Sequence, residues 1–89
     1  MAELLRRDAN VIVAEVDGKP LLLNLRSWTY VSFNDTAARI WELLETARGR
    51  DDLLGHLLAE YDAGDEEIAA ELDGFLALLR EQGMIAAVQ

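Results

Sequence analysis

Short runs of β-branched and alternating apolar residues occupy the first third of the chain and predict β-strands. Residues 10–16 form the first run, and Asp17-Gly18 behind it is the strongest short-range signal for a hairpin turn. The return strand covers residues 21–26, and a third strand is expected over residues 28–33, where every residue except Ser32 favours strand. The alternation in the second strand places Leu21, Leu23 and Leu25 on one face, with Asn24 and Arg26 on the other.

After residue 33 the apolar spacing changes to about 3.6 residues, which predicts three helices. Asn34 or Asp35 can cap the first helix, and Gly49 is expected to end it. The second helix opens with Asp51-Asp52, and the third runs from Asp65 to a C-terminal Gly83. The expected core stripes are Ala37, Ile40, Trp41 and Leu44 in the first helix, Leu54, Leu57, Leu58 and Tyr61 in the second, and Ile68, Leu72, Phe75, Leu76 and Leu79 in the third.

Strands followed by helices, rather than alternating with them, indicate an α+β domain. A three-stranded antiparallel sheet followed by three helices also provides the parts of a winged helix-turn-helix. A chain of 89 residues forms a single domain. We expect residues 1–9 to be a flexible lead-in and residues 10–89 to be the folded unit.

Composition excludes most kinds of catalytic and metal-binding site. The chain has no cysteine and one histidine, which removes disulfides, thiolate metal sites, thiol nucleophiles and Ser-His-Asp catalysis. The net charge is −9, and residues 59–89 carry Arg80 as their only base, so nucleic acids and anionic membranes would be repelled. No apolar run is long enough to span a membrane, and the N-terminus lacks the long apolar region of a signal peptide. Both observations favour a cytoplasmic location.

Individual polar residues do not form a catalytic, cofactor or metal site. His56 points away from the apolar stripe of its helix and is expected at the solvated surface. The acidic residues 62–67 lack the alternate ligand spacing of a calcium loop and are better explained as helix caps. Ser27 and Ser32 both lie in the strand region, which excludes an acyl carrier with its serine at a helix start. We therefore expect no enzyme activity.

The aromatic third strand allows two interpretations. Its position at the end of a three-stranded meander makes it an edge strand, with Val31 and Phe33 facing the core and Trp28 and Tyr30 on the opposite face. The aromatic pair can simply cover the sheet. Alternatively, the free edge can capture an extended peptide by β-augmentation, in which backbone hydrogen bonds supply affinity and neighbouring pockets supply specificity.

The third helix has a widened apolar face. Leu78 lies about 100° of helical angle from the centre of the predicted core stripe. It can pack on Met84 or a neighbouring helix, or it can form one wall of a groove.

The ordered series of residues from Gly18 to Ile85, about three quarters of the chain, resembles the PqqD-like domains. These domains are also called recognition elements of ribosomally synthesised and post-translationally modified peptides (RiPPs). The residues that carry the resemblance are Asp17-Gly18, Leu25-Arg26-Ser27, Tyr30, Phe33-Asn34, residues 37–44, Leu57, Tyr61-Asp62, Ile68, Phe75-Leu76, Leu79 and Gly83-Met84-Ile85. The chain departs from the family at Trp28, where these domains usually have a small residue, often glycine.

The resemblance implies a non-catalytic domain that binds the leader region of a precursor peptide. The leader would add a strand to the third strand, in a groove walled by the third helix, and would be presented to a modifying enzyme or leader peptidase. The implied peptide-binding residues are Trp28, Thr29, Tyr30, Val31 and Ser32 on the edge, with Ile68, Glu71, Leu72, Phe75 and Leu78 on the wall.

The short N-terminal region is most similar to the standalone proteins of lasso-peptide clusters. A peptide chaperone for a radical SAM enzyme of PQQ biosynthesis is an alternative within the same family. Two other classes are an acidic adaptor that binds a partner through its helices and a winged-helix DNA-binding protein. Charge disfavours DNA binding, because Arg80 is the only base of the third helix and is opposed there by Glu66, Glu67, Glu71, Asp73 and Glu81.

Overall fold

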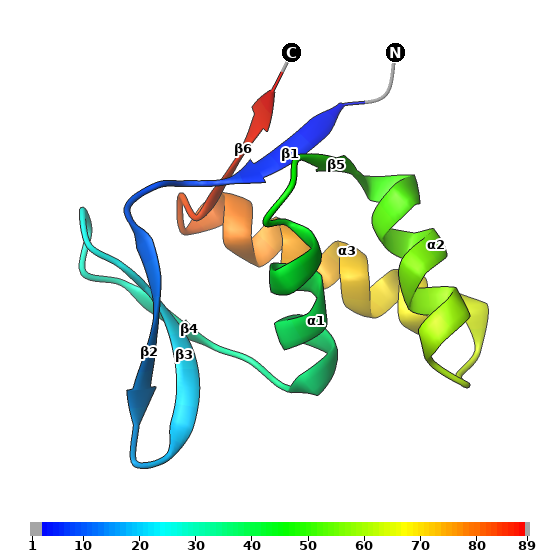
Figure 1. Cartoon of the computed structure of the whole chain (residues 1–89), viewed down its shortest axis with the longest axis horizontal. Helices are drawn as coiled ribbons and strands as arrows, with labels where there is room; N and C mark the ends of the chain where they lie inside the picture. Colours follow the sequence, from blue (N-terminus) through cyan, green and yellow to red (C-terminus); the bar gives the residue numbers. More distant parts are fainter. Residues whose placement is uncertain (1–2, 89) are drawn as a thin grey trace.

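Two small antiparallel sheets and three helices make up residues 3–88, the part of the chain that the computed structural model describes (Figure 1). One sheet has the strand order β2-β3-β4 and the other β5-β1-β6. The α+β class is confirmed, with the predicted three-stranded sheet followed by three helices. The strands are β1 (Leu4–Arg7), β2 (Val11–Val16), β3 (Lys19–Asn24), β4 (Tyr30–Ser32), β5 (Arg48–Gly49) and β6 (Ile85–Val88), and the helices are α1 (Asp35–Leu43), α2 (Arg50–Glu60) and α3 (Asp65–Glu81).

The turn between β2 and β3 forms where the sequence predicts it. Asp17 and Gly18 have φ angles of +53° and +78°, and the flanking Val16 and Lys19 pair across the two strands. A two-residue hairpin turn of the type I′ kind requires left-handed backbone at both positions, which Asp-Gly tolerates best. The resulting ribbon projects beyond the three helices (Figure 1).

The hydrophobic core lies between the inner face of this sheet and the three helices. Register places Leu22 between Val13 and Val31, and the Leu22 side chain is completely buried. The buried face of β3 therefore carries Leu22 and Asn24, whereas Leu25 is exposed. The core cluster consists of Leu5, Leu22, Val31, Ile40, Trp41, Leu43, Leu44, Leu53, Leu57, Ile68, Leu72, Leu76, Leu79, Met84 and Ile85.

The helix ends follow local capping rules. Asn34, rather than Asp35, caps α1, because its Oδ1 accepts a hydrogen bond of 2.9 Å from the Ala37 N–H. At the end of α3, Gly83 has a φ angle of +68°, and the Met84 N–H donates to the Leu79 carbonyl at 2.8 Å. This turn folds Met84 back into the core, where it is fully buried.

Three expectations about the helices need correction. Gly49 does not end the first helix: it lies in β5, and the helix stops at Leu43. Leu53 is the fully buried residue at the start of α2, while Leu54 is only partly buried, because the helix is rotated toward α3. Phe75 is also only partly buried.

Within residues 3–88, no helix is long and apolar enough to cross a membrane.

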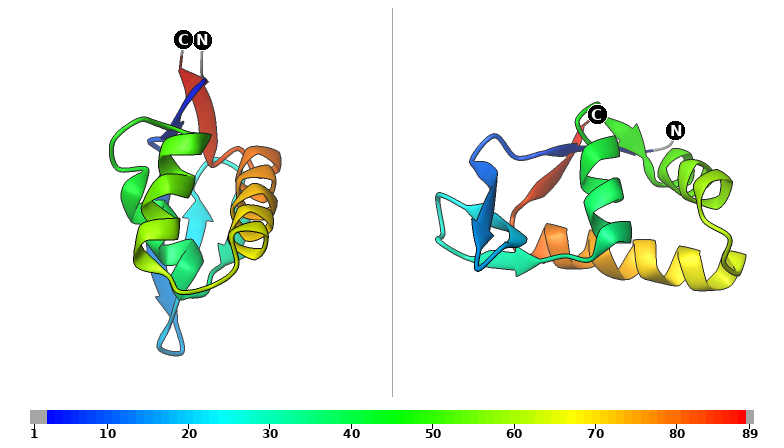
Figure 2. Two further views of the ribbon diagram at one scale, coloured as in Figure 1. Left: turned by 90° about the vertical axis from the view of Figure 1, so that its right-hand side faces the viewer. Right: turned by 60° about the horizontal axis from the view of Figure 1, so that its bottom comes forward.

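The N-terminal segment is not a loose lead-in. Leu4–Arg7 form β1, which pairs with β5 on one side and with β6 on the other (Figure 2). The Leu5 side chain is buried in the core. The physical reason is that β6, contributed by the last residues described, supplies four backbone partners for β1. Met1 and Ala2, which the expected lead-in also included, lie outside the described residues, as does Gln89 at the end of the expected folded unit.

Candidate functional site

One edge of β4 is unpaired within the described part of the chain, because the sheet order is β2-β3-β4. The Asn24 N–H donates to the Thr29 carbonyl at 2.9 Å, which makes Asn24 and Thr29 a hydrogen-bonded pair. Hydrogen-bonded and non-hydrogen-bonded pairs alternate along antiparallel strands, so the backbone of Val31 faces β3. The backbone N–H and C=O groups of Tyr30 and Ser32 therefore point outward, available to another strand.

A groove of about 290 Å³ adjoins this edge, between the end of β4, the start of α1 and one side of α3. Its apolar surface comes from side chains of all three elements, and small residues on α3 keep it open. A Cβ atom added to Gly74 would meet no atom within 4 Å. The lining residues are Ser32, Phe33, Asn34, Ala37, Ile40, Ala70, Glu71, Gly74, Phe75 and Leu78.

The polar rim of the groove is formed by two side chains. Asn34 Nδ2 donates to Glu71 Oε1 at 3.2 Å, and Asn34 Oδ1 is engaged as the cap of α1. The rim therefore joins the start of α1 to the middle of α3. An apolar side chain entering the groove would leave water, while its backbone could remain level with the rim and the β4 edge.

The structure separates the residues expected on the edge strand. Trp28 and Thr29 precede β4, and Val31 is buried in the core, so only its backbone belongs to the strand edge. Trp28 and Tyr30 are 70% and 67% exposed, so neither joins the core. Ser32 lies where the edge meets the groove.

The residues expected on α3 also separate into two groups. Glu71, Phe75 and Leu78 line the groove, and Leu78 remains 39% exposed rather than packing fully on a neighbour. Ile68 and Leu72 lie on the adjacent stripe of the helix, which faces the core, and both are buried there. The sequence signal that could have distinguished the two groups is a second apolar stripe on the helix, offset from the core stripe. Sequence reasoning missed the groove residues Phe33, Asn34, Ala37, Ile40, Ala70 and Gly74.

Trp28 carries a strained backbone beside the edge. Its φ angle of +60° lies in the left-handed region, which costs a residue with a Cβ roughly 1–2 kcal/mol. Because the indole is largely exposed, Trp28→Gly loses little burial. We expect Trp28→Gly to raise the free energy of unfolding by about 1 kcal/mol, measured by urea denaturation. Trp28→Ala keeps the strain and should give no such gain; equal stabilisation by both variants would contradict this explanation.

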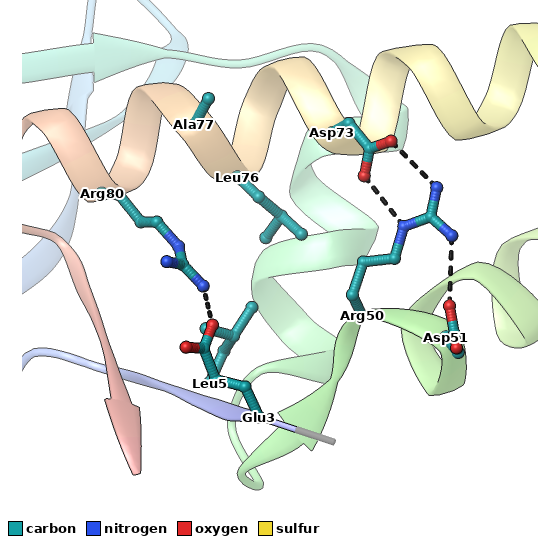
Figure 3. A pocket seen from close by; sticks show the side chains of 8 residues that line it. All are labelled: Glu3, Leu5, Arg50, Asp51, Asp73, Leu76, Ala77 and Arg80. Carbon is teal, nitrogen blue, oxygen red and sulfur yellow. Dashed lines mark hydrogen bonds and ion pairs between the residues drawn. The ribbon is translucent and has the colours of Figure 1, made fainter. Parts of the chain in front are cut away.

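A second cavity, of about 330 Å³, lies between β1, α2 and α3, but its charges are already paired (Figure 3). Arg50 contacts both carboxylate oxygens of Asp73 at 2.9 Å and also pairs with Asp51. Arg80 forms an ion pair with Glu3 across the same cavity. These contacts connect Glu3, just before β1, and the start of α2 to α3, which indicates a structural role rather than a ligand site.

The Arg50–Asp73 pair predicts how stability responds to acid. The hydrogen bonds from Arg50 lower the pKa of Asp73 below its ordinary value of 3.8. A lowered folded-state pKa gives stability that is present above the unfolded pKa and disappears as pH falls through the folded pKa. We expect the difference in unfolding free energy between wild type and Asp73→Asn to be constant at neutral pH and to shrink below about pH 4. Urea denaturation at a series of pH values measures it.

Asp62→Asn is the control for this titration, because Asp62 forms no ion pair among residues 3–88. Its difference from wild type should change much less over the same pH range. A difference between wild type and Asp73→Asn that persists at pH 2 would show that the ion pair is not its source.

His56 lies at the surface, as predicted. Its side chain is 40% exposed, with Nε2 at 3.1 Å from Arg48 Nη1 and 3.8 Å from Asp52 Oδ1. Nowhere in residues 3–88 do three potential metal ligands come together.

Comparison with known proteins identifies the family. The family profile of coenzyme PQQ synthesis protein D (PqqD) matches residues 21–85. No curated protein matches the chain. A solved structure of TbiB1 in complex with the TbiA(beta) leader peptide has a TM-score of 0.76 at 25% identity, over 94% of this chain and 98% of that one.

Two further structures share the fold. Lasso peptide synthetase B1, complexed with its leader peptide, has a TM-score of 0.73 at 29% identity, over 92% of this chain and 96% of that one. The PqqD part of Methylobacterium extorquens PqqCD, a stand-alone RiPP recognition element, has a TM-score of 0.70 at 20% identity, over 93% and 88% of the two chains. Because the profile covers most of the residues and the fold agrees throughout, this chain belongs to the PqqD family.

Proposed function

We propose that this protein binds the leader region of a ribosomally made precursor peptide, of the lasso-peptide type, by adding it as a strand to β4. The observation that carries the proposal is the unpaired β4 edge directly beside an apolar groove. β2 is the other edge of the sheet, but the groove lies at β4. Two structural relatives of at least 25% identity hold leader peptides, which supports the same kind of ligand here.

Strand addition accounts for both affinity and choice of sequence. The outward backbone groups of Tyr30 and Ser32 supply hydrogen bonds that any extended peptide can form. Side chains of the added strand alternate between two faces, so every second one points toward α3. The apolar groove beside Phe75 and Leu78 selects an apolar side chain at that position.

The role is binding and presentation rather than catalysis. The groove lining contains one ionisable side chain, Glu71, and no general acid–base pair or nucleophile with a base. Holding the leader raises the local concentration of the attached core peptide at a bound enzyme. We place this event in the cytoplasm, where ribosomal peptides are made, with a modifying enzyme or leader peptidase as the second partner.

Isothermal titration with the leader peptide encoded beside this chain tests the proposal. We expect a one-to-one complex with micromolar or tighter affinity. Backbone amide exchange on the same complex should slow at residues 28–33. Absence of binding heat at high micromolar concentrations would contradict leader binding. Slowed exchange confined to α1, α2 and α3 would instead indicate an adaptor that binds through its helices.

A further inference from the structure

The outer face of the β2-β3-β4 sheet is apolar and uncovered. We define this outer face by its apolar side chains, Ile12, Ala14, Val16, Leu21, Leu23 and Tyr30, which register places, together with Lys19 and Ser32, on the side opposite Leu22 and Val31. Ile12 is 44% exposed, Val16 54% and Tyr30 67%. The core and the three helices lie on the other side of the sheet (Figures 1 and 2). Contiguous exposed apolar surface of this kind marks a protein interaction site.

Charge is distributed unevenly between the two halves of the protein. Residues 3–33, which contain the whole β2-β3-β4 sheet, carry four basic and four acidic side chains. Residues 34–88 carry four basic and thirteen acidic ones. The entire net charge of −9 therefore belongs to the helical half. The outer face is the part of the surface that an acidic protein could approach without strong repulsion.

Two arginines at one end of the outer face strengthen the difference in charge between this face and the acidic helical half. Within residues 3–88, Arg6 and Arg26 lie within 4 Å of no carboxylate, whereas Arg39, Arg48, Arg50 and Arg80 all form ion pairs. Arg6 and Arg26 line a hollow of about 310 Å³ together with Asn10.

This hollow is continuous with the outer face. The Leu25 N–H donates to the Asn10 carbonyl at 2.8 Å, which extends the β2–β3 pairing past Ile12 and Leu23 to the hollow. Hydrogen bonds from Asn10, together with the nearby Arg26 and Arg6 charges, lower the pKa of Asp8 in the hollow. A carboxylate is therefore favoured there, and the single carboxylate of Asp8 leaves positive charge in excess.

We propose that the outer face, with the Arg6–Arg26 hollow at its end, docks a folded protein whose contact surface is apolar and flanked by carboxylates. The occupant is the enzyme that receives the bound peptide, so this inference rests on the proposed function. Tyr30 belongs both to the outer face and to β4, and a peptide strand added to β4 extends the same face. A protein covering this face therefore reaches the peptide as well.

A second copy of this chain fits the surface less well. In a two-fold dimer the same patch meets itself, so the outer face of one copy would have to complement that of the other. The outer face carries no carboxylate to pair with Arg6 and Arg26, because the excess acidic residues lie in the helical half.

Matched charge substitutions on β2 test the proposal. Ile12→Asp places a carboxylate on the outer face, and Val13→Asp places the same group on the adjacent, 55% exposed residue of the opposite face. Arg26→Glu reverses the charge at the hollow. Because Arg26 lies in an exposed turn, the effect of this variant does not depend on strand packing. Each protein is titrated with the fluorescently labelled leader peptide encoded beside this chain. It is then titrated with the modifying enzyme or leader peptidase encoded there.

We expect Ile12→Asp and Arg26→Glu to weaken enzyme binding by about tenfold or more, while leader affinity stays within about twofold of wild type. Val13→Asp should leave both affinities unchanged. Enzyme affinity that survives both Ile12→Asp and Arg26→Glu, or is absent in wild type, overturns the proposal and leaves leader binding standing. Sedimentation equilibrium gives a further check. A wild-type dimer that Ile12→Asp dissociates would also overturn the proposal, because the outer face would then be the interface between two copies of this chain. Failure of the wild type to bind the leader would instead reject the proposed function.

Discussion

Gly74→Leu is expected to stabilise the protein and at the same time to weaken leader binding by about tenfold or more. Glycine inside a helix costs roughly 1 kcal/mol relative to a good helix former, and at Gly74 an added Cβ meets no neighbouring atom within 4 Å. The free energy of unfolding should therefore rise by nearly 1 kcal/mol. The leucine side chain, however, occupies the groove that a side chain of the added strand is proposed to enter.

Gly55→Leu is a matched control for this experiment. Gly55 also lies inside a helix with no atom within 4 Å of an added Cβ, but it is in α2, beside Asp51, Asp52 and His56 rather than at the groove. It should stabilise the protein by a similar amount and leave leader affinity unchanged. Urea denaturation and calorimetric titration give the two quantities. Unaltered leader affinity in Gly74→Leu would exclude the groove as the site of side-chain recognition.

Asn24→Ala is expected to lower the free energy of unfolding by about 3 kcal/mol, the largest stability effect among the variants considered. The Asn24 side chain is 95% buried, with 5% of its surface exposed, and it joins two distant parts of the chain. Its Nδ2 donates to the Gln82 carbonyl at 3.1 Å, and its Oδ1 accepts from the Arg26 N–H at 2.9 Å. Alanine leaves these partly buried backbone groups without their side-chain partner, and an unsatisfied buried group costs roughly 1–3 kcal/mol.

Asn10→Ala provides the comparison, because Asn10 is only partly buried and its side chain bonds locally to Asp8. We expect Asn10→Ala to cost about 1 kcal/mol or less. Tryptophan fluorescence during urea denaturation measures both variants. A loss below about 1 kcal/mol in Asn24→Ala would mean that water replaces the lost bonds and that Asn24 does not hold the β3–β4 turn against α3.

Features governed by neighbours in the sequence were predicted well. The Asp17-Gly18 turn, the Asn34 cap and the Gly83 helix end each depend on backbone preferences and on bonds that span a few residues. The apolar stripe of α1 was also found, because the 3.6-residue spacing directly reports which side of a helix is buried. These local signals were sufficient for the α+β class and the order of its main elements.

Features governed by distant pairing were not predicted. The segment Leu4–Arg7 has no local signal for a strand, and it becomes one because β6 approaches it from the other end of the chain. The burial of Asn24 was likewise missed, since its partners Gln82 and Gly83 lie 58 and 59 residues away. In α3 the core stripe was recognised, but Ile68 and Leu72 were assigned to the groove wall although their side chains are buried in the core.

The amino-acid sequence by itself determined the Asp17-Gly18 turn, the helices and their caps, and the contrast between a first third with no net charge and an acidic remainder, because these depend on residue type and short-range spacing. Only the tertiary structure decided which edge of the sheet meets α3, which α3 residues line the groove, and which sheet face is left bare. Those properties depend on the rotation of each element about its axis, and packing between residues far apart in the sequence sets that rotation.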